Sequence, residues 1–275
     1  MRVPLKLKFY YLLSRFFQKN KTPNFSMDTP REIRPGEEFA LEKLKTYLSE
    51  NNINTDNLSI KQFPSGYSNL TYFLKSSSQE FVLRRPPFGA KSLQGGHDMF
   101  REYNVLKNLK SQFTKVPDVY LYCDNNEIIG VPFYLMERVE GYIIRPNLQQ
   151  KDSPGKEVIQ RVSKSLVSSL VELHNVDIDQ ANLNELGNIN GYIKRQVEGW
   201  IKRYNHSKTD SIANMDFIAS WLHENQPLEV QGSIVHNDFK YDNLVLDKDN
   251  HSKITAVLDW EMATIGDPFM DLGTT

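Results

Sequence analysis

Residues 236–243 read His-Asn-Asp-Phe-Lys-Tyr-Asp-Asn, and residues 258–261 read Leu-Asp-Trp-Glu. Short apolar runs of strand type flank the first segment and lead into the second, at 233–235, 243–246 and 254–258. Runs of this kind predict strands, so the polar residues between them are expected to form an anchored loop. The pattern therefore predicts that Asp238, Asn243 and Asp259 lie close together at strand ends.

These three side chains are of the types that phosphoryl transfer from ATP requires. A carboxylate accepts the proton of the acceptor hydroxyl, and oxygen ligands hold Mg²⁺ on the triphosphate. Asp238 is the candidate catalytic base, and Asn243 and Asp259 are candidate metal ligands, because amide and carboxylate oxygens suit a hard cation. The alternative is an Asp/Asn-rich hairpin beside an unrelated strand end. The order of all these residues, ahead of Gly-Asp-Pro at 266–268 and of Asp271, favours the site.

The two segments resemble the motifs of the aminoglycoside phosphotransferase-like kinases, a superfamily that includes choline, ethanolamine and homoserine kinases. In particular they resemble the kinase domains fused to some acyl-CoA dehydrogenases, through Val-Leu-Asp-Trp-Glu-Met-Ala-Thr-Ile-Gly-Asp-Pro at 257–268. The resemblance covers about residues 30–275, and Asn237 stands where the family often has Gly. It implies an α+β, protein kinase-like, two-lobed fold with a small β-rich N-lobe and a larger helical C-lobe.

The same resemblance divides the chain into three parts. Residues 1–27 form a basic extension, 28–140 the N-lobe, and 141–275 the C-lobe with the catalytic loop. Related kinases continue with further C-lobe helices, so we expect this C-lobe to be truncated at Thr275. The extension carries six Lys/Arg and no acidic residue, which indicates a targeting or membrane-surface segment; the alternatives are a disordered extension and an upstream start ahead of an initiator at Met27.

A turn at 64–69, Pro-Ser-Gly-Tyr-Ser-Asn, joins two strand-type runs. A turn with glycine and small polar residues can aim backbone N–H groups at phosphate oxygens, although such a turn alone is more often an ordinary hairpin. It resembles the Gly-x-Ser-Asn-Leu-Thr-Tyr turn of the family. The resemblance implies that Gly66, Ser68 and Asn69 bind the nucleotide.

The next predicted strand carries two consecutive arginines, Arg84 and Arg85. In kinases this strand supplies a lysine that contacts the phosphates and pairs with a helix glutamate. Arg84 takes that place here, with Arg85 on the opposite face, and a guanidinium can still bind phosphate. Glu102, on a helix predicted at about 97–113, is the expected partner. The alternatives are a surface charge on an edge strand and a solvated helix carboxylate.

Residues 131–141 predict a strand that leaves into a turn. In the kinase fold this strand becomes the hinge, whose backbone recognises adenine, so Glu137 and Val139 are expected beside the base. Two helices are predicted beyond it, at 158–176 and 189–205. Aromatic and basic residues on the second indicate either an acceptor-binding helix or an amphipathic surface helix.

Composition excludes few classes of protein. The 33 Lys/Arg and 34 Asp/Glu residues nearly balance, so nucleic acid is not an expected partner. Cys123 is the only cysteine, which excludes an intrachain disulfide and suits a reducing compartment. We expect a cytoplasmic protein, with a mitochondrial or membrane-surface location through residues 1–26 as the alternative. No apolar run is long enough to be a transmembrane segment.

The sequence therefore predicts an ATP- and Mg²⁺-dependent phosphotransferase that moves the γ-phosphoryl group to a hydroxyl of a small molecule. By resemblance the acceptor is a hydroxy-acyl-CoA or a hydroxy acid, and a linkage to an acyl-CoA dehydrogenase is implied. The alternatives are a choline- or homoserine-type kinase, and a truncated, inactive domain that binds a nucleotide or a partner. A protein kinase is disfavoured because Asp-Phe-Gly and Ala-Pro-Glu are absent.

Overall fold

A computed structural model describes residues 24–26, 29–64, 68–89, 97–145 and 155–275. Gly66 and the 1–23 part of the basic extension lie outside these residues. The N-terminal part contains an antiparallel sheet with the strand order β2 (Ser59–Gln62), β3 (Leu70–Lys75), β4 (Glu80–Arg85), β6 (Phe133–Glu137) and β5 (Val119–Cys123). Since β4 lies in the middle of this sheet, Arg84 is not on an edge strand.

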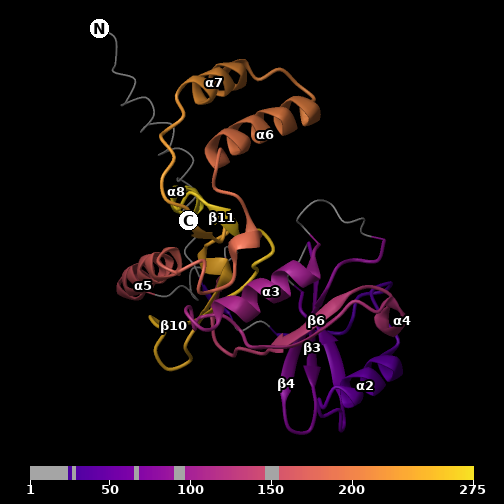
Figure 1. Cartoon of the computed structure of the whole chain (residues 1–275). Coiled ribbons are helices and arrows are strands. Elements are labelled where there is room, and N and C mark those ends of the chain that lie inside the picture. The colour runs from indigo at the N-terminus through magenta and orange to yellow at the C-terminus, as the bar shows by residue number, and fades with distance from the viewer. Residues whose placement is uncertain (1–23, 27–28, 65–67, 90–96, 146–154) are drawn as a thin grey trace.

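Helices cover the sheet on both faces (Figure 1). On one side are α2 (Leu41–Glu50) and the short α4 (Asn126–Ile129), and α2 buries Leu44 and Leu48 against the sheet. On the other side lies α3 (Met99–Leu109), which begins where the Asp98 side chain accepts a 2.9 Å hydrogen bond from a backbone N–H of the first turn.

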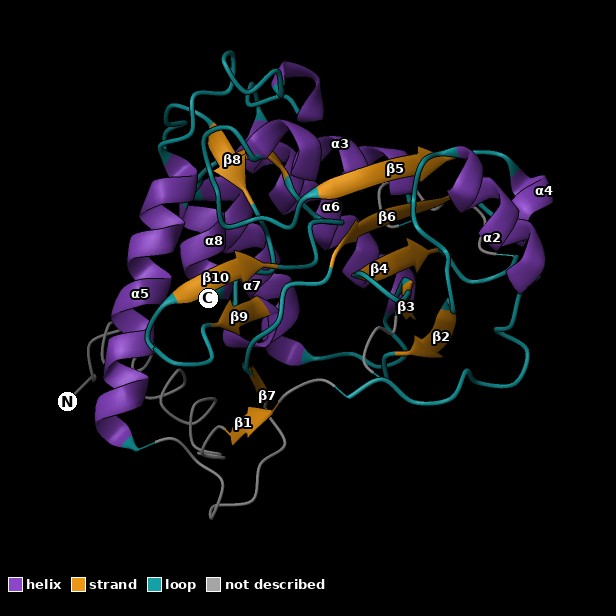
Figure 2. Ribbon diagram, turned by 90° about the horizontal axis from the view of Figure 1, so that it is seen from below, coloured by secondary structure: helices purple, strands orange, loops and turns teal. Residues whose placement is uncertain are grey.

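The second part of the chain is mainly helical, with short strand pairs between the helices (Figure 2). Its elements, in chain order, are β7 (Ile143–Arg145), α5 (Lys156–His174), η2 (Asn184–Leu186), α6 (Tyr192–Ser207), α7 (Ala213–Glu224), β8 (Ser233–Val235), η3 (Tyr241–Asn243), β9 (Leu244–Leu246), β10 (Ile254–Val257), β11 (Thr264–Gly266) and α8 (Phe269–Thr274). A final pair is formed by β1 (Asn24–Ser26) with β7.

The loop that carries the candidate base is not a hairpin. Strand β8 pairs with β11, and β9 pairs with β10, so the strands on either side of residues 236–243 belong to different sheets. The hairpin alternative is therefore wrong. Each end of the loop is anchored by a separate strand pair, which fixes the loop without requiring its two ends to pair with each other.

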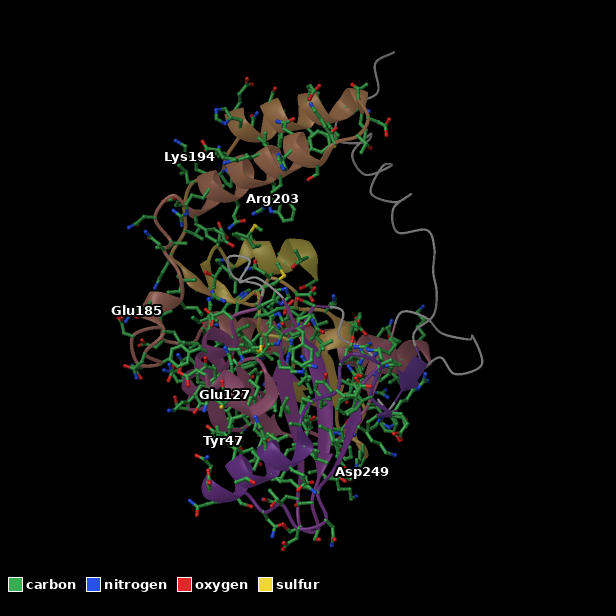
Figure 3. All side chains as sticks on the ribbon, turned by 90° about the vertical axis from the view of Figure 1, so that its right-hand side faces the viewer. Tyr47, Glu127, Glu185, Lys194, Arg203 and Asp249 are labelled. Atoms are coloured by element: carbon green, nitrogen blue, oxygen red, sulfur yellow. The ribbon has the colours of Figure 1, made fainter. Side chains whose placement is uncertain are left out.

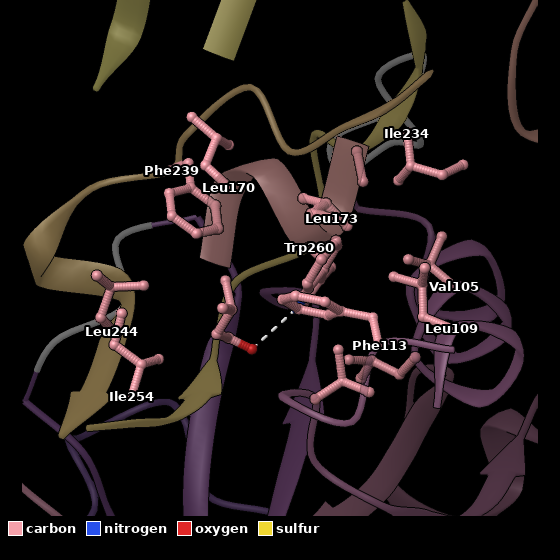
Figure 4. Packing of buried hydrophobic residues seen from close by; sticks show 14 of the residues in the cluster. Val105, Leu109, Phe113, Leu170, Leu173, Ile234, Phe239, Leu244, Ile254 and Trp260 are labelled. Carbon is pink, nitrogen blue, oxygen red and sulfur yellow. Dashed lines mark hydrogen bonds between the residues drawn. The ribbon is translucent and has the colours of Figure 1, made fainter. Parts of the chain in front are cut away.

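The largest hydrophobic core packs around Trp260 (Figure 4). Its indole Nε1 donates a 2.9 Å hydrogen bond to the carbonyl of Val257, and its ring meets Phe113 edge-on. Leu173 of α5 and Leu109 of α3 belong to the same cluster. Because the core contains residues from both sides of position 140, it fixes Asp259, next to Trp260, against the sheet.

Helices α6 and α7 form a hairpin that stands away from the remaining elements (Figure 1). Figure 3 labels two basic residues of this hairpin, Lys194 and Arg203, both on α6. The hairpin and α8 expose several large apolar side chains, namely Trp200, Phe217, Ile218, Trp221, Phe269 and Leu272. No helix in the described ranges is long and apolar enough to cross a membrane.

Arg85 contributes to folding and faces away from the candidate site, as the strand period predicts. Its guanidinium is fully buried and donates hydrogen bonds to the Tyr72 hydroxyl and the Glu37 carbonyl, each at 2.7 Å. Arg85→Met is expected to lower the free energy of unfolding by about 2 kcal/mol, because its charge-assisted hydrogen bonds, which include a third from Nη1 to the Pro86 carbonyl at 3.2 Å, are lost while the aliphatic volume remains. Urea unfolding followed by tryptophan fluorescence measures this, and the exposed Lys61→Met should change stability by less than about 0.5 kcal/mol. Equal effects of both changes would contradict a stabilising role of Arg85.

Candidate active site

A cavity of about 340 Å³ separates the sheet from the loop at 236–243. Six of the predicted site residues line it: Ser68, Arg84, Glu137, Val139, Asn243 and Asp259. Asn69 and Glu102 are each only 1% exposed and lie behind the wall. Asp238 does not line the cavity itself. It contacts Asn243 and Lys240, and both of these residues line the cavity.

Arg84 joins the two parts of the site. Its Nη1 lies 3.0 Å from Glu102 Oε1 on α3, and its Nη2 lies 3.0 Å from Asp259 Oδ1. Burial by itself lowers the pKa of this guanidinium, but the surrounding carboxylates outweigh burial and raise it, so Arg84 stays charged. The solvated-carboxylate alternative for Glu102 is wrong, since the side chain is buried and also accepts the backbone N–H of Trp260 at 3.3 Å.

Asp259 directs its carboxylate toward the cavity from an unusual backbone conformation. Its φ is 68°, in the left-handed region, which residues other than glycine adopt rarely, with Asp and Asn the most frequent exceptions. Burial opposes ionisation, but the charge and hydrogen bond of Arg84 lower the pKa of Asp259. Only Oδ1 is bonded within the described part of the chain, so Oδ2 is available to a ligand.

Asp238 is held by two neighbours from its own loop. Asn243 Nδ2 donates to Asp238 Oδ2 at 2.8 Å and to the Asp238 carbonyl at 2.9 Å, while Lys240 Nζ lies 2.9 Å from Oδ1. The preceding residue, Asn237, has φ 61°, which turns the chain between the strand and the base. Both side-chain hydrogen bonds of Asn243 use its amide nitrogen, and no described residue donates to its Oδ1. Asn243 Oδ1 is therefore available to a ligand in the cavity.

Sequence reasoning missed the role of Asp271, whose side chain holds the start of the loop at 236–243 by hydrogen bonds. This fully buried carboxylate accepts the backbone N–H of His236 at 2.8 Å and that of Asn237 at 2.6 Å. His174 Nε2 lies 3.0 Å from the same group, at the end of α5. No local pattern reveals contacts across 34 or 35 residues, so only the Asp-Pro-x-x-Asp spacing at 267–271 could have drawn attention to it.

His236 connects the loop at 236–243 to the segment that carries Asp259. Its Nδ1 accepts the backbone N–H of Asp238 at 3.2 Å, which makes Nε2 the protonated nitrogen, 3.0 Å from the carbonyl of Leu258. Burial lowers the pKa of His236, in agreement with a neutral ring. The ring therefore positions the two segments and has no free nitrogen for proton transfer.

A second group that sequence reasoning missed is Glu261. Its carboxylate lies 3.8 Å from Arg84 Nη2, so Arg84 faces three acidic side chains. Burial and the nearby charge of Asp259 raise the pKa of Glu261 to about 7, against the opposing charge of Arg84. The Asp-Trp-Glu motif at 259–261 contains this residue, but its proximity to Arg84 appears only in three dimensions.

Part of the cavity lining is apolar, and we call this part the slot. Val82, Met136, Val245 and Leu258 belong to it. The backbone N–H and C=O of Val139 make no hydrogen bond with any described residue, whereas the N–H of Glu137 donates to the Asp118 carbonyl at 2.7 Å. An unpaired donor and acceptor beside a flat apolar slot suit a purine-type base.

The donor set fits a Mg²⁺–nucleotide. Asn243 Oδ1 and Asp259 Oδ2 are hard oxygen donors that both border the cavity. Within the described ranges, no three His, Cys, Asp or Glu side chains gather as a metal cluster. Magnesium characteristically uses one or two protein oxygens together with substrate phosphates and water, so two side chains are a sufficient protein contribution.

The α+β arrangement of sheet and helices, with a candidate base, two hard oxygen donors and a buried Arg–Glu pair around one cavity, is that of a kinase-like phosphotransferase fold. The chain belongs to the phosphotransferase enzyme family APH, whose family model matches residues 59–275. The predicted fold class and family are thereby confirmed.

Comparison with curated proteins and solved structures agrees with this assignment. The chain is 40% identical over 255 residues to acyl-CoA dehydrogenase family member 11 of Rattus norvegicus, covering 90% of this chain and 32% of that protein. It thus spans about a third of that relative. A crystal structure from Ralstonia eutropha, named as a candidate aminoglycoside phosphotransferase, is 32% identical with a TM-score of 0.74, covering 86% of this chain and 69% of that one. A ternary complex of an aminoglycoside phosphotransferase with ADP and hygromycin B, at 17% identity and a TM-score of 0.57, shares the fold over 84% of this chain and 74% of that one.

Proposed function

We propose that this protein transfers the γ-phosphoryl group of ATP to a hydroxyl of a small molecule. One observation carries the proposal. Across one cavity, Asp238 is oriented by Asn243 and Lys240, while Asp259 is oriented by the Arg84–Glu102 pair. Phosphoryl transfer depends chiefly on positioning and charge stabilisation, and this arrangement supplies both.

The base and the phosphate-binding groups would act in one step. Asp238 accepts the proton of the acceptor hydroxyl as that oxygen bonds to the γ-phosphorus and the bond to the β-phosphate oxygen breaks, leaving ADP. Asn243 and Asp259 would hold Mg²⁺, which neutralises charge on the phosphates. Arg84, kept charged and aimed by Glu102, would contact the phosphates with Ser68 of the preceding turn, while Asn69, buried behind the cavity wall, would hold the adjoining backbone in place. Gly66 is proposed for the same turn.

The slot at the hinge supports ATP as the donor. The Val139 N–H and C=O can pair with the adenine edge, with Glu137 beside it, and Met136 and Leu258 can sandwich the ring. Neighbours of this fold were solved with ADP and with GDP, which supports a purine nucleotide as the donor. A nucleotide bound there would extend its phosphates toward Arg84 and Asp259.

For the acceptor, the α6 helix supports a hydroxylated substrate with an anionic group, such as a hydroxy-acyl-CoA or a hydroxy acid. Lys194, Lys202 and Arg203 lie on this helix, and the Arg203 guanidinium stacks 4.5 Å from the centre of the Trp200 ring. Cations beside an exposed aromatic ring suit a phosphate-bearing nucleotide tail. Similarity to a relative named as an acyl-CoA dehydrogenase adds support. Comparing ADP release with hydroxy-acyl-CoA, choline and homoserine separates this acceptor from the alternatives.

Mg-ATP should stabilise the full chain, and Asp259→Ala should abolish that effect. A ligand at a hundred times its Kd adds about 2.7 kcal/mol to folding, which corresponds to a rise in Tm of about 5 °C or more. Differential scanning fluorimetry measures the shift. Asp249→Ala, at an exposed turn, is the matched control and should retain it. A folded wild-type protein without any shift would contradict nucleotide binding, and a full shift in Asp259→Ala would remove Asp259 from the metal site.

A further inference from the structure

Three side chains from distant parts of the sequence form a hydrogen-bonded chain behind the cavity. Asn69 Nδ2 donates to Glu261 Oε2 at 2.6 Å, and Asn69 Oδ1 lies 2.8 Å from His97 Nδ1. Asn69 and Glu261 are 192 residues apart, and Asn69 and His97 are 28 apart. We call this set, His97–Asn69–Glu261, the latch.

The latch ties together the three segments that surround the proposed phosphate position. Asn69 immediately precedes β3 and ends the turn at 64–69. His97 lies just before α3, the helix that supplies Glu102, and Glu261 lies two residues beyond Asp259. Asn69 is therefore bonded directly to the acidic segment of the other part of the chain.

The chemistry at position 69 is specific. Asn69 is 1% exposed, and its amide uses the nitrogen as a donor to Glu261 and the oxygen opposite His97. An amide can satisfy both neighbours at once, whereas a carboxylate in its place would meet the carboxylate of Glu261. In a buried setting, a hydrogen bond to a charged group is worth more than one between neutral groups, and its loss is correspondingly larger.

We propose that Glu261, through Asn69 and His97, is a positioning residue that holds the backbone at Ser68 and Asn69 against the Asp259 segment. The inference rests on the proposed function, because the latch matters only if the cavity binds a nucleoside triphosphate. Glu261 acts on the nucleotide through Asn69. The latch therefore affects the binding of the triphosphate, while the base slot at Val139 stays intact.

The test is a charge-exchange cycle on the full chain, with dissociation constants for Mg-ATP and for adenosine measured by calorimetry in mildly alkaline buffer. Asn69→Asp places two carboxylates face to face and should weaken Mg-ATP binding about tenfold while adenosine binding changes less than about twofold. Glu261→Gln keeps an acceptor for Asn69 and should stay within about threefold of wild type. The double change Asn69→Asp with Glu261→Gln restores a donor–acceptor pair at unchanged net charge, and should recover most of the lost affinity.

A matched control and the pattern of losses distinguish the latch from a general structural defect and from direct contact of Glu261 with the metal or the phosphates. Asn104→Asp adds the same charge on α3 at a side chain with no hydrogen bond to a described residue, and should leave Mg-ATP affinity unchanged. If Asn69→Asp weakened the binding of Mg-ATP and of adenosine equally, the change would cause a general structural defect, and the latch would be overturned. A loss in Glu261→Gln alone that the double change does not recover would assign Glu261 to the metal or the phosphates, which also overturns it. If wild-type protein binds neither ligand, the proposed function itself fails, and that outcome is distinct from wild-type binding with an unimpaired Asn69→Asp.

Discussion

Asp238→Asn is expected to lower the turnover number about 10³-fold while leaving the Mg-ATP dissociation constant within about twofold of wild type. The amide has nearly the shape of the carboxylate and can still accept a hydrogen bond from Asn243 Nδ2, so the loop should keep its conformation. It cannot accept the proton of the acceptor hydroxyl, however, and the step that needs a base is lost. ADP release with an acceptor that the wild type phosphorylates gives turnover, and calorimetry gives nucleotide affinity.

Asp242→Asn is the matched control, since this carboxylate belongs to the same loop. Asp242 Oδ1 accepts from Arg145 Nη1 at 2.7 Å at the border of the cavity, and it has no contact with Asp238 among the hydrogen bonds of the described loop. Its turnover should fall no more than about threefold, the effect of one partly exposed ion pair. Unchanged turnover in Asp238→Asn would exclude Asp238 as the base. An equal loss in both variants would point to the conformation of the loop instead of proton transfer.

Features that depend on local periodicity were predictable from the sequence. Alternation along one strand places Arg84 and Arg85 on opposite faces, and the structure shows Arg84 against Glu102 and Arg85 against Tyr72. The helix that carries Glu102 was recognisable by its apolar spacing. The strand runs beside the loop at 236–243 were recognisable by their β-branched residues. Each of these signals lies within about ten residues of sequence, where backbone geometry alone decides which side chains share a face.

Features that depend on pairing between distant segments were not predictable. Nothing in the sequences of β8 and β9 states that they pair with β11 and β10 instead of with each other, because short apolar strands have similar propensities for many partners. The two missed acidic residues follow the same rule. Glu261 acquires its raised pKa from burial beside Asp259, and Asp271 acquires its partners from the turn of the chain after β11. A single sequence carries the residues for such contacts without their geometry.

Asp271→Ala is expected to lower the free energy of unfolding by about 3 kcal/mol or more, because it leaves two buried backbone N–H groups without an acceptor. Asp271→Asn should lower the free energy of unfolding by about 1–2 kcal/mol. An amide has only one oxygen, so its NH₂ group must face the backbone N–H of either His236 or Asn237, and that N–H loses its acceptor. Both changes release the start of the base loop. In the folded fraction, turnover should therefore fall about 10²-fold, as expected for a displacement of about 1 Å at the reacting group.

Asp267→Asn provides the comparison for Asp271, because this neighbouring buried carboxylate accepts only the local backbone N–H of Phe269, at 2.9 Å, among the hydrogen bonds of the described residues. Asp267→Asn should lower the free energy of unfolding by about 1 kcal/mol or less and leave the turnover number within a few-fold of wild type. Urea unfolding and ADP release, measured on the same samples, separate the two effects. Full turnover in Asp271→Asn would show that the loop keeps its position without this carboxylate. A loss of turnover in Asp271→Asn that exceeds the loss of stability places its main effect on the geometry of Asp238, through the two N–H groups that precede the base.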